Sequence, residues 1–301
     1  MSISDENSFL VSAIIPTHNR SKMLNRSINS VLNQTYSAVE CIIIDDGSTD
    51  NTGDIVKAMK DDRLIYYRHK YNRGASASRN TGIRNASGEL IAFLDDDDEW
   101  LPTKLEKQVA MLRNLPRKIG MVYCWMDYFN EKGVLVHEHH PTLRGDVFPQ
   151  LLDAQRLGGC PTLLVRRGVI EKVGGFDESL PRGNDGDFIR RVCKKYEVNY
   201  IPEVLVKVHT GHCDRIGLNT RNGLNNHIYS AKTRLVKFRN DFEKYPEAKA
   251  NLYFDIANTY LRLRNYTNSL LYYLRFRIVS KSKFKGISTL KKLIMSELRN
   301  V

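Results

Sequence analysis

Short apolar runs alternate with amphipathic stretches along the first hundred residues. Val11–Ile15 and Glu40–Ile44 are β-rich runs, and Leu90–Leu94 is a third apolar run of similar length. Runs of about five apolar residues bounded by polar ones are typical of buried parallel strands. Between them, apolar residues recur at three- and four-residue steps over residues 23–32 and 55–59, which indicates helices. The alternation predicts an α/β fold with a mostly parallel sheet and right-handed crossovers.

The pattern continues less regularly in the middle of the chain. A strand is expected at Leu64–Tyr67, a helix opening at Gly74–Gly82 and a further helix around Leu105–Leu112. Gly120–Trp125 is predicted to be a strand, and Asp127–Arg144 a loop or hairpin. The remaining expected elements are a strand over 161–165, a glycine-capped helix over 169–177, a helix over 185–196 and a strand over 198–208 that Pro202 interrupts.

The chain beyond Asn222 has a continuous helical pattern, so two regions are expected. They are an α/β domain over residues 1–222 and a basic helical region over residues 223–301, and 301 residues are enough for both. Residues 231–301 hold sixteen Lys or Arg and five Asp or Glu, so they contribute +11 of the net charge of +12. A local excess of positive charge favours an anionic partner, which is either a membrane surface or a nucleic acid.

Tyrosines, apolar residues and arginines are interleaved at helical spacing in this region, for example over Leu252–Phe276. The pattern predicts a helical hairpin whose apolar face packs against the α/β domain, and it also suits a helix lying in a lipid interface. No RNA- or DNA-binding module is recognisable, so nucleic acid is not expected as a partner.

The cysteines and the amino terminus bear on the compartment. The five cysteines include no CxxC pair, which fits a reducing cytoplasm rather than a disulfide or zinc framework. Met1–Leu10 is polar and acidic, and the sequence has no stretch of eighteen or more apolar residues. We therefore expect a cytoplasmic protein that is neither exported nor membrane-spanning, and that can associate peripherally with the inner face of the cell membrane.

Two acidic clusters, Asp45–Asp46 and Asp95–Asp98, directly follow two of the expected strands. Open α/β sheets bind ligands at the carboxyl ends of their strands, so both clusters are expected at one ligand-binding edge. Four adjacent carboxylates repel one another, and burying them requires compensation such as a hard divalent cation held through oxygen. A solvated acidic loop is the competing interpretation.

Six segments together carry a resemblance to a known family. They are VSAIIPTHNR from Val11, IIIDDGSTDNT from Ile42, GASASRNTGI from Gly74, GELIAFLDDDDEWLPTKLEKQ from Gly88, GGFDESL from Gly174 and NDGDFIRR from Asn184. In number, order and spacing they resemble the family 2 glycosyltransferases, over roughly residues 8–215. The resemblance implies the GT-A fold, a Rossmann-like and mostly parallel sheet flanked by helices, here followed by the C-terminal helical extension.

The resemblance also implies a site for a UDP-sugar donor. Asp46 is expected to contact uracil, with Thr17 near the same base, although a helix N-cap is the alternative for Asp46. Asp95 is expected to approach the ribose. Asp97 is expected to ligate manganese or magnesium (Mn²⁺ or Mg²⁺) that bridges the diphosphate and offsets the charge developing on the departing UDP.

Neighbouring residues are assigned to the same site. Asp96 is expected to be a spacer within the nucleotide-binding segment, and Asp98 to be an acid at the amino terminus of the next helix. His209 is expected near the metal or the diphosphate, a role also open to His212, with Arg215 close by. The other expected nucleotide-binding residues are Pro16, Asn19, Arg20 and Arg79, the last of which could instead cap its helix together with Asn80.

A third carboxylate cluster is expected to serve the acceptor. An inverting transfer needs one base to deprotonate the acceptor hydroxyl as it attacks the anomeric carbon, and the resemblance places Asp185 in that role. Asp187 is the second candidate. Asn184 stands where the family usually has a glutamate, which bears on the orientation of the acceptor or of the base.

Together these observations predict a metal-dependent inverting glycosyltransferase. We expect it to move a hexosyl or N-acetylhexosaminyl group from a UDP-sugar to a hydroxyl of a glycan, lipid-linked by resemblance, in surface polysaccharide synthesis. The alternatives are a sugar nucleotidyltransferase, for which the usual glycine-rich loop near the amino terminus is missing, and a catalytically degenerate membrane-associated scaffold, which Asn184 alone favours.

Overall fold

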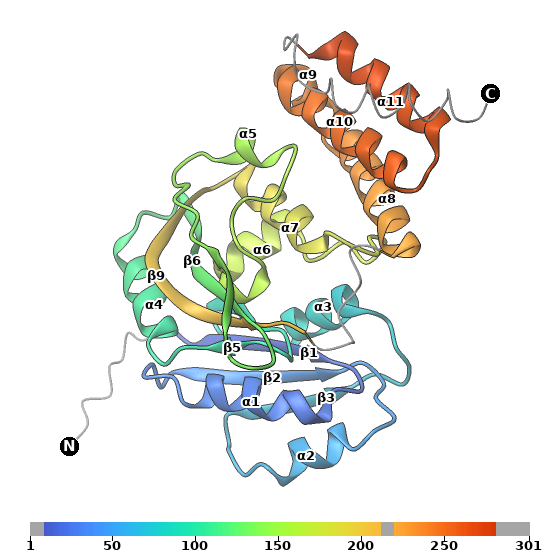
Figure 1. Ribbon diagram of the computed structural model, residues 1–301. Coiled ribbons are helices and arrows are strands. Elements are labelled where there is room, and N and C mark those ends of the chain that lie inside the picture. Colours follow the sequence, from blue (N-terminus) through green and yellow to red (C-terminus); the bar gives the residue numbers. More distant parts are fainter. Residues whose placement is uncertain (1–8, 212–219, 281–301) are drawn as a thin grey trace. The chain divides into compact units, whose positions relative to one another are not determined.

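The computed structural model of the chain describes residues 9–211 and 220–280. Their contacts group them into two compact units (Figure 1). Of the described residues, unit 1 contains 9–147, 157–178 and 188–211, and unit 2 contains 148–156, 179–187 and 220–280. The expected division into an α/β domain over residues 1–222 and a helical region over residues 223–301 stays a prediction.

The described residues of unit 1 form a nine-stranded sheet. Its strands are β1 (Val11–Thr17), β2 (Val39–Asp45), β3 (Leu64–Arg68), β4 (Leu90–Phe93), β5 (Glu99–Trp100), β6 (Ile119–Phe129), β7 (Leu135–His139), β8 (Leu164–Arg166) and β9 (Glu197–His209). The order is β3-β2-β1-β4-β8-β6-β9-β5, with β7 paired to β6. The ladders of β2 on β3, of β1 on both β2 and β4, and of β6 on β9 are parallel, and those of β4 on β8, β5 on β9 and β6 on both β7 and β8 are antiparallel. The predicted α/β class is confirmed.

Helices cover both faces of the parallel strands at the start of the chain (Figure 1). They are α1 (Ser21–Leu32), α2 (Thr52–Ala58) and α3 (Ala75–Asn85). Val11, Ala13 and Ile15 join one core cluster with residues of α1 and α2. Ile14 points to the other face, where a Cβ built on Gly82 of α3 would lie 2.4 Å from Ile14 Cγ2. Alternate side chains of β1 point to opposite faces and every residue of the strand is buried, so both of its faces are covered.

Two expected strands differ from the observed ones, in both cases at a proline. Residues 161–165 were expected to be one strand, but Cys160–Thr162 forms a 3-10 turn and β8 begins at Leu164. Pro161 fits the first turn of a helix because it has no N–H to donate to a ladder. Conversely, β9 is not interrupted at Pro202. The register passes from Cys124 opposite Ile201 to Trp125 opposite Val204, so Pro202 lies in a bulge.

The remaining helices largely follow the sequence pattern. They are α4 (Lys104–Asn114), α5 (Phe148–Leu151), α6 (Arg167–Val173) and α7 (Asn184–Cys193). Gly174 ends α6 with φ of 80°, as expected of a C-terminal glycine. The expected loop or hairpin over 127–144 contains the β6–β7 hairpin. The boundary between the units falls within α7, between Asp187 and Phe188.

Unit 2 is helical in its described part. Its longer helices are α8 (Arg221–Lys237), α9 (Arg239–Lys244), α10 (Pro246–Arg262) and α11 (Tyr266–Val279). α10 and α11 form the expected helical hairpin, in which the Phe254 and Phe276 rings are 5.0 Å apart and Ser269 Oγ donates to Ala257 O at 2.8 Å. The expected continuation of the helical pattern over 281–301 lies outside the described residues.

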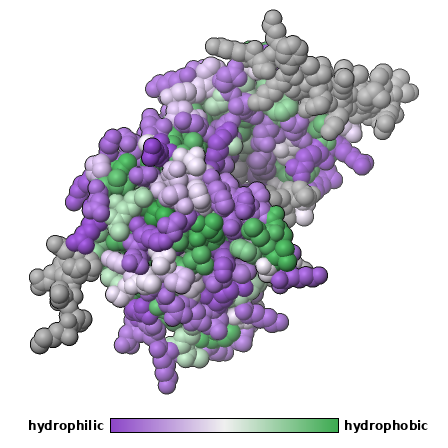
Figure 2. Space-filling model, turned by 60° about the vertical axis from the view of Figure 1, so that its left-hand side comes forward, coloured by the Kyte–Doolittle hydropathy of each residue, from purple (hydrophilic) through white to green (hydrophobic). Residues whose placement is uncertain are grey.

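The surface is mainly polar on the face shown in Figure 2, where hydrophobic residues gather in smaller patches. Within residues 9–211 and 220–280, no helix has the length and apolar character needed to cross a membrane.

Candidate active site

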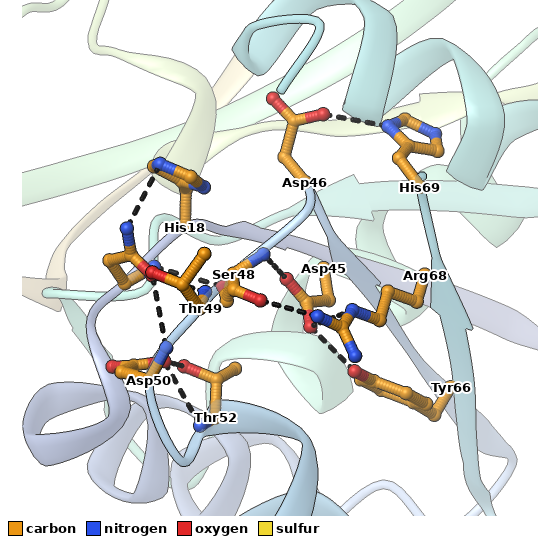
Figure 3. A network of polar contacts seen from close by, with 11 residues as sticks. His18, Asp45, Asp46, Ser48, Thr49, Asp50, Thr52, Tyr66, Arg68 and His69 are labelled. Atoms are coloured by element: carbon orange, nitrogen blue, oxygen red, sulfur yellow. Dashed lines mark hydrogen bonds and ion pairs between the residues drawn. The ribbon is translucent and has the colours of Figure 1, made fainter. Parts of the chain in front are cut away.

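The turn after β2 is built around Asp45 (Figure 3). Its Oδ1 accepts a hydrogen bond from Ser48 N at 2.8 Å, and its Oδ2 accepts one from the Tyr66 hydroxyl at 2.6 Å. Arg68 Nε lies 3.6 Å from the same Oδ2, and the Asp45 side chain is 1% exposed. Asp45 therefore serves the turn, and the neighbouring Asp46 is the acid directed elsewhere.

Asp46 connects the end of β2 to the loop before α3. Its Oδ1 accepts from Arg73 N at 2.9 Å and lies 2.7 Å from His69 Nδ1, and its Oδ2 accepts from Gly74 N at 2.6 Å. His69 Nε2 in turn lies 3.0 Å from Thr81 Oγ1 on α3. Asp46 is not a helix N-cap, the alternative considered from the sequence, because Asn51 is the N-cap of α2 and Gly74 that of α3. The expected contact of Asp46 with uracil stays a prediction, and it would be made in addition to these hydrogen bonds.

Residues between β1 and α1 close the same edge of the sheet. Asn19, at φ of 54°, donates its N–H to Ser48 Oγ at 2.9 Å, and its Oδ1 accepts from Thr49 N at 2.7 Å. Pro16 and Thr17, the last residues of β1, are buried. Because β1 and β2 are parallel neighbours, Thr17 pairs with Asp45 at the carboxyl ends of both strands. The structure therefore brings the two segments together as the sequence predicted.

Three of the four acids after β4 are buried, and arginines compensate the charge of the tetrad. Asp96, Asp97 and Asp98 are 5%, 5% and 2% exposed, which excludes a solvated loop. Arg20 Nη1 lies 2.9 Å from Asp96 Oδ1 and 3.1 Å from Asp97 Oδ2. The two further arginine contacts are Arg79 Nη2 to Asp95 Oδ1 at 2.6 Å and Arg26 Nη2 to Asp97 O at 2.6 Å.

Asp96 is buried and paired with Arg20; burial raises its pKa to about 6, although Arg20 opposes the shift. One expectation within the tetrad is wrong. Asp98 is not at a helix amino terminus, since α4 begins only at Lys104. Its Oδ1 instead accepts from His209 N at 3.3 Å, and its carbonyl accepts from Ser27 Oγ at 2.7 Å.

His209 ends β9 close to the tetrad, because β5 pairs with β9 directly after the acids. Its Nε2 lies 3.3 Å from Glu99 Oε2. Burial lowers the pKa of the imidazole, Arg26 and Lys207 act in the same direction, and Glu99 opposes them. His212 and Arg215 lie outside the described residues.

The described part of the chain contains no group of three His, Cys, Asp or Glu side chains that could hold a metal ion alone. Asp97 supplies a hard carboxylate oxygen, and it lies at the strand edge where the donor is expected. A site of this kind fits Mg²⁺ or Mn²⁺ held by one or two protein ligands together with substrate phosphates, and not a metal caged by protein.

The candidate acceptor acids belong to unit 2, in the first turn of α7. Asp187 is 5% exposed and forms an ion pair with Lys237, whose Nζ lies 2.8 Å from Oδ1 and 2.9 Å from Oδ2. Asp185 is half-buried, and its Oδ1 accepts from Gly186 N at 2.7 Å. Asn184 Oδ1 accepts from Asp185 N at 2.8 Å. The ion pair with Lys237 therefore engages Asp187 and not Asp185.

Some residues that shape these clusters gave little signal in the sequence. His69, Arg26 and Lys237 contact the acidic residues, yet none lies within a motif that specifies its partner. His69 follows β3, and its position at the end of a third parallel strand is the feature that could have indicated it. Lys237 is 50 residues from Asp187, so only the folded chain connects them.

Comparison with known proteins places the chain among sugar-transferring enzymes. The family profile described as Glycosyl transferase family 2 matches residues 12–174, more than half of the chain. An uncharacterized glycosyltransferase of Rickettsia typhi is 34% identical over 219 residues, which cover 70% of this chain and 67% of that protein. The Escherichia coli protein WfgD, named as UDP-Glc:alpha-D-GlcNAc-diphosphoundecaprenol beta-1,3-glucosyltransferase, is 39% identical over 127 residues, covering 42% of this chain and 49% of WfgD.

Solved structures match over most of the chain. S. aureus TarS 1-349 in complex with UDP-GlcNAc has a TM-score of 0.61 at 16% identity, covering 92% of this chain and 94% of that one. The mannosyltransferase PcManGT from Pyrobaculum calidifontis, in complex with GDP-Man and Mn²⁺, has a TM-score of 0.61 at 16% identity, covering 98% and 88%. At this identity the likeness concerns the fold, and it confirms the expected GT-A architecture.

Proposed function

Because this chain belongs to glycosyl transferase family 2, we propose that it moves a hexosyl or N-acetylhexosaminyl group from a UDP-sugar to a glycan hydroxyl, with inversion at the anomeric carbon. The observation that carries the proposal is the compact acidic edge of unit 1. There, Asp46 follows β2 and the acidic tetrad follows β4, both beside the end of β1.

The donor is proposed to lie along this edge. Asp46 has one oxygen, Oδ2, with a single backbone donor, so it can accept a further hydrogen bond from the uracil ring. Asp95, whose side chain is 35% exposed, is the tetrad acid that a ribose can reach. Arg20 and Arg79 already lie on these carboxylates, and their guanidinium groups suit a diphosphate as a second partner.

A divalent cation would be held by Asp97, with His209 as the second candidate ligand. When bound, Mn²⁺ or Mg²⁺ would neutralise charge on the leaving diphosphate. Arg20 would then be released from Asp97 by the competing cation and would remain paired with Asp96.

Asp185 is proposed as the base of the acceptor reaction. It would take the proton of the acceptor hydroxyl while that oxygen bonds to the anomeric carbon and the bond to UDP breaks. A single displacement of this kind converts an α-linked donor into a β-linked product. The ion pair on Asp187 supports this choice of base, because Lys237 Nζ already contacts both oxygens of that carboxylate.

Two relatives support the substrate class. The name of WfgD specifies a UDP-glucose donor and a diphosphoundecaprenol-linked acceptor, and TarS was solved with UDP-GlcNAc. We therefore propose a UDP-sugar as donor and a lipid-linked glycan as acceptor for this chain. PcManGT was solved with GDP-Man, so a GDP-sugar belongs in the donor screen as the comparison.

The function is tested by measuring nucleotide release from a panel of UDP- and GDP-sugars with Mn²⁺, with and without a chelator. Release of UDP that requires the metal is expected. A nucleotidyltransferase would instead respond to pyrophosphate, and a scaffold would release nothing, so either result would overturn the proposal.

Asp185→Ala is the sharper test of the mechanism. Loss of a general base should lower the transfer rate by about 10² to 10⁴ and leave the affinity for UDP nearly unchanged. Transfer rates and UDP binding by calorimetry check this, with Asp187→Asn as the comparison. Full transfer activity in Asp185→Ala would show that the base is another group.

An anionic membrane surface is the further partner that we propose, contacted through α11. Leu270, Leu271, Leu274 and Ile278 are 41%, 43%, 50% and 84% exposed. At 100° per residue they fall within an arc of about 100°, with Arg275 beyond one edge and Arg277 beyond the other. An apolar stripe between cationic side chains suits a helix that lies in the headgroup region of an anionic bilayer. Such a contact would bring the enzyme to a lipid-linked acceptor.

A further inference from the structure

We propose that α8 positions the catalytic base, with Ser230 and Lys237 as positioning residues that hold the segment 179–187. The inference rests on the proposed function, because it takes Asp185 as the base. It assigns to the C-terminal helical region a part in the transfer step that no sequence motif indicates.

The segment 179–187 belongs to unit 2. Residues 179–187 lie between strands of unit 1 in the sequence, yet their contacts group them with the helices after residue 220. The motif that carries Asp185 is therefore supported by the helical region.

The contacts lie on both sides of Asp185. Ser230 Oγ donates to Arg182 O at 2.6 Å, and Ser230 itself is 9% exposed. Lys237 Nζ bonds both oxygens of Asp187. Ser230 and Lys237 are seven residues apart on α8, two turns along one face, so a single rigid helix fixes the backbone before and after the base.

A third residue on the same face ties this arrangement to the rest of unit 2. Arg234 Nη1 donates to Asp153 O at 2.5 Å, and Asp153 Oδ2 accepts from Asn251 Nδ2 of α10 at 2.9 Å. Burial lowers the pKa of Arg234, and the charges of Asp153, Asp185 and Asp187 are among those that oppose the shift. Arg234 therefore lies within electrostatic reach of both acids.

The physical reason for the effect is the burial of Asp187. Its side chain is 7% exposed, and Lys237 neutralises it. Without the lysine the buried carboxylate would lose the cation that contacts both of its oxygens, so the first turn of α7 would shift to hydrate it. Asp185 lies two residues away and would move with the turn. A misplacement of about 1 Å at a reacting group can lower a rate by about 10²-fold.

The experiment is Lys237→Met in the full-length chain. We expect kcat for transfer to fall by about 10- to 100-fold, with little change in the affinity for UDP. Lys237→Arg keeps the charge and should restore much of the rate. The matched control is Lys249→Met, which removes a lysine paired at 2.7 Å with the exposed Glu243 in the same unit and should leave transfer unchanged.

Hydrogen exchange gives a second readout that needs no substrate. In Lys237→Met, backbone amides of 179–187 should exchange faster, while those of 45–50 and 95–98 should keep their protection. Unchanged exchange in 179–187, or a loss of UDP affinity as large as the loss of kcat, would overturn the positioning role.

Asp185→Asn separates this inference from the proposed function. Loss of transfer in Asp185→Asn together with full activity in Lys237→Met would overturn the positioning role alone. Full activity in Asp185→Asn would overturn the base assignment and the positioning role with it. Loss of transfer in both, with UDP binding retained, is the expected result.

Discussion

At the scale of single residues, the acidic edge is stable because arginines from α1 and α3 neutralise it. Arg20 bridges Asp96 and Asp97 and is itself 20% exposed, so the pair is largely shielded from water. Arg79 forms an ion pair with Asp95 from the other face of the sheet. The guanidinium groups thus supply positive charge that compensates these carboxylates without a bound metal.

Arg20→Met tests whether this arginine compensates the charge of Asp96 and Asp97. Removing the guanidinium that contacts both Asp96 and Asp97 should lower the free energy of unfolding by on the order of 3 kcal/mol. Mn²⁺ should then raise Tm more in Arg20→Met than in the native protein, because Arg20 no longer competes with the metal for Asp97. Thermal unfolding with and without Mn²⁺ measures this, with the exposed Arg113→Met as control. Equal shifts in both proteins would contradict the competition.

Lys104 offers a pH-dependent test in the core of unit 1. It is fully buried, its Nζ lies 2.8 Å from Gln108 Oε1 and 3.9 Å from the centre of a Trp100 ring, and burial lowers its pKa to about 8. In the unfolded chain a lysine titrates near pH 10.4. Between these values the unfolded state binds more protons, so rising pH should stabilise the native protein relative to Lys104→Met. The slope should reach at most about 1.4 kcal/mol per pH unit.

Urea unfolding of both proteins from pH 7 to pH 10 checks this difference, and the comparison cancels the titration of tyrosines and cysteines. A constant difference across the range would mean that the ammonium group is not destabilised by burial.

At the scale of elements, the close approach of α3 to β1 aligns the loop before α3 with the site. Gly82 allows Ile14 to pack against the helix, and the amino-terminal end of the same helix receives the Asp46 contact at Gly74. At the middle of α3, the Asn80 side chain accepts from Phe176 N at 2.7 Å and donates to Phe176 O at 2.9 Å. One helix therefore joins three segments that are distant in the sequence.

Gly82→Ala should destabilise the protein by about 1–3 kcal/mol, because the added methyl would overlap Ile14. Gly168→Ala is the matched control. Gly168 lies in α6, where a built Cβ would lie 4.0 Å from Glu171 Oε2, so alanine there should stabilise by about 0.5–1 kcal/mol. Chemical denaturation distinguishes the two, and a neutral Gly82→Ala would show that the helix can move away from β1.

At the scale of the whole molecule, the charge is concentrated near the carboxyl end, where residues 231–301 contribute +11 of +12. The described part of this region presents the apolar stripe of α11 between two arginines. Charge and apolar area thus coincide in one unit, and both favour an anionic bilayer over free solution.

The full chain should sediment with anionic vesicles and not with neutral ones. Raising the ionic strength from about 0.1 M to about 1 M shortens the screening length from about 10 Å to about 3 Å and should weaken the binding. Replacing Leu271 and Leu274 by serine should weaken it at both ionic strengths, whereas Val236→Ser, an exposed apolar residue of α8, should not. Absence of binding to anionic vesicles would exclude the membrane as a partner.

Most elements were predictable because their patterns are local. The apolar runs of β1, β2 and β4 and the steps of α1 belong to single segments, and the structure confirms them. Pro202 was misjudged because a proline is compatible with a strand where a bulge removes its partner, and the bulge depends on β6, which is far away in the sequence. The role of Asp98 was misjudged for the same reason, since its partner His209 is 111 residues away.

The sequence by itself determined the α/β order, the family and the positions of the acidic clusters at strand ends, because these follow from local periodicity and from short motifs. Only the tertiary structure decided which charges compensate which acids. It paired Arg20 with the tetrad and Lys237 with Asp187, and it grouped the Asp185 segment with the C-terminal helices. The physical reason is that burial and Coulomb energy depend on distances in space, which no local pattern encodes.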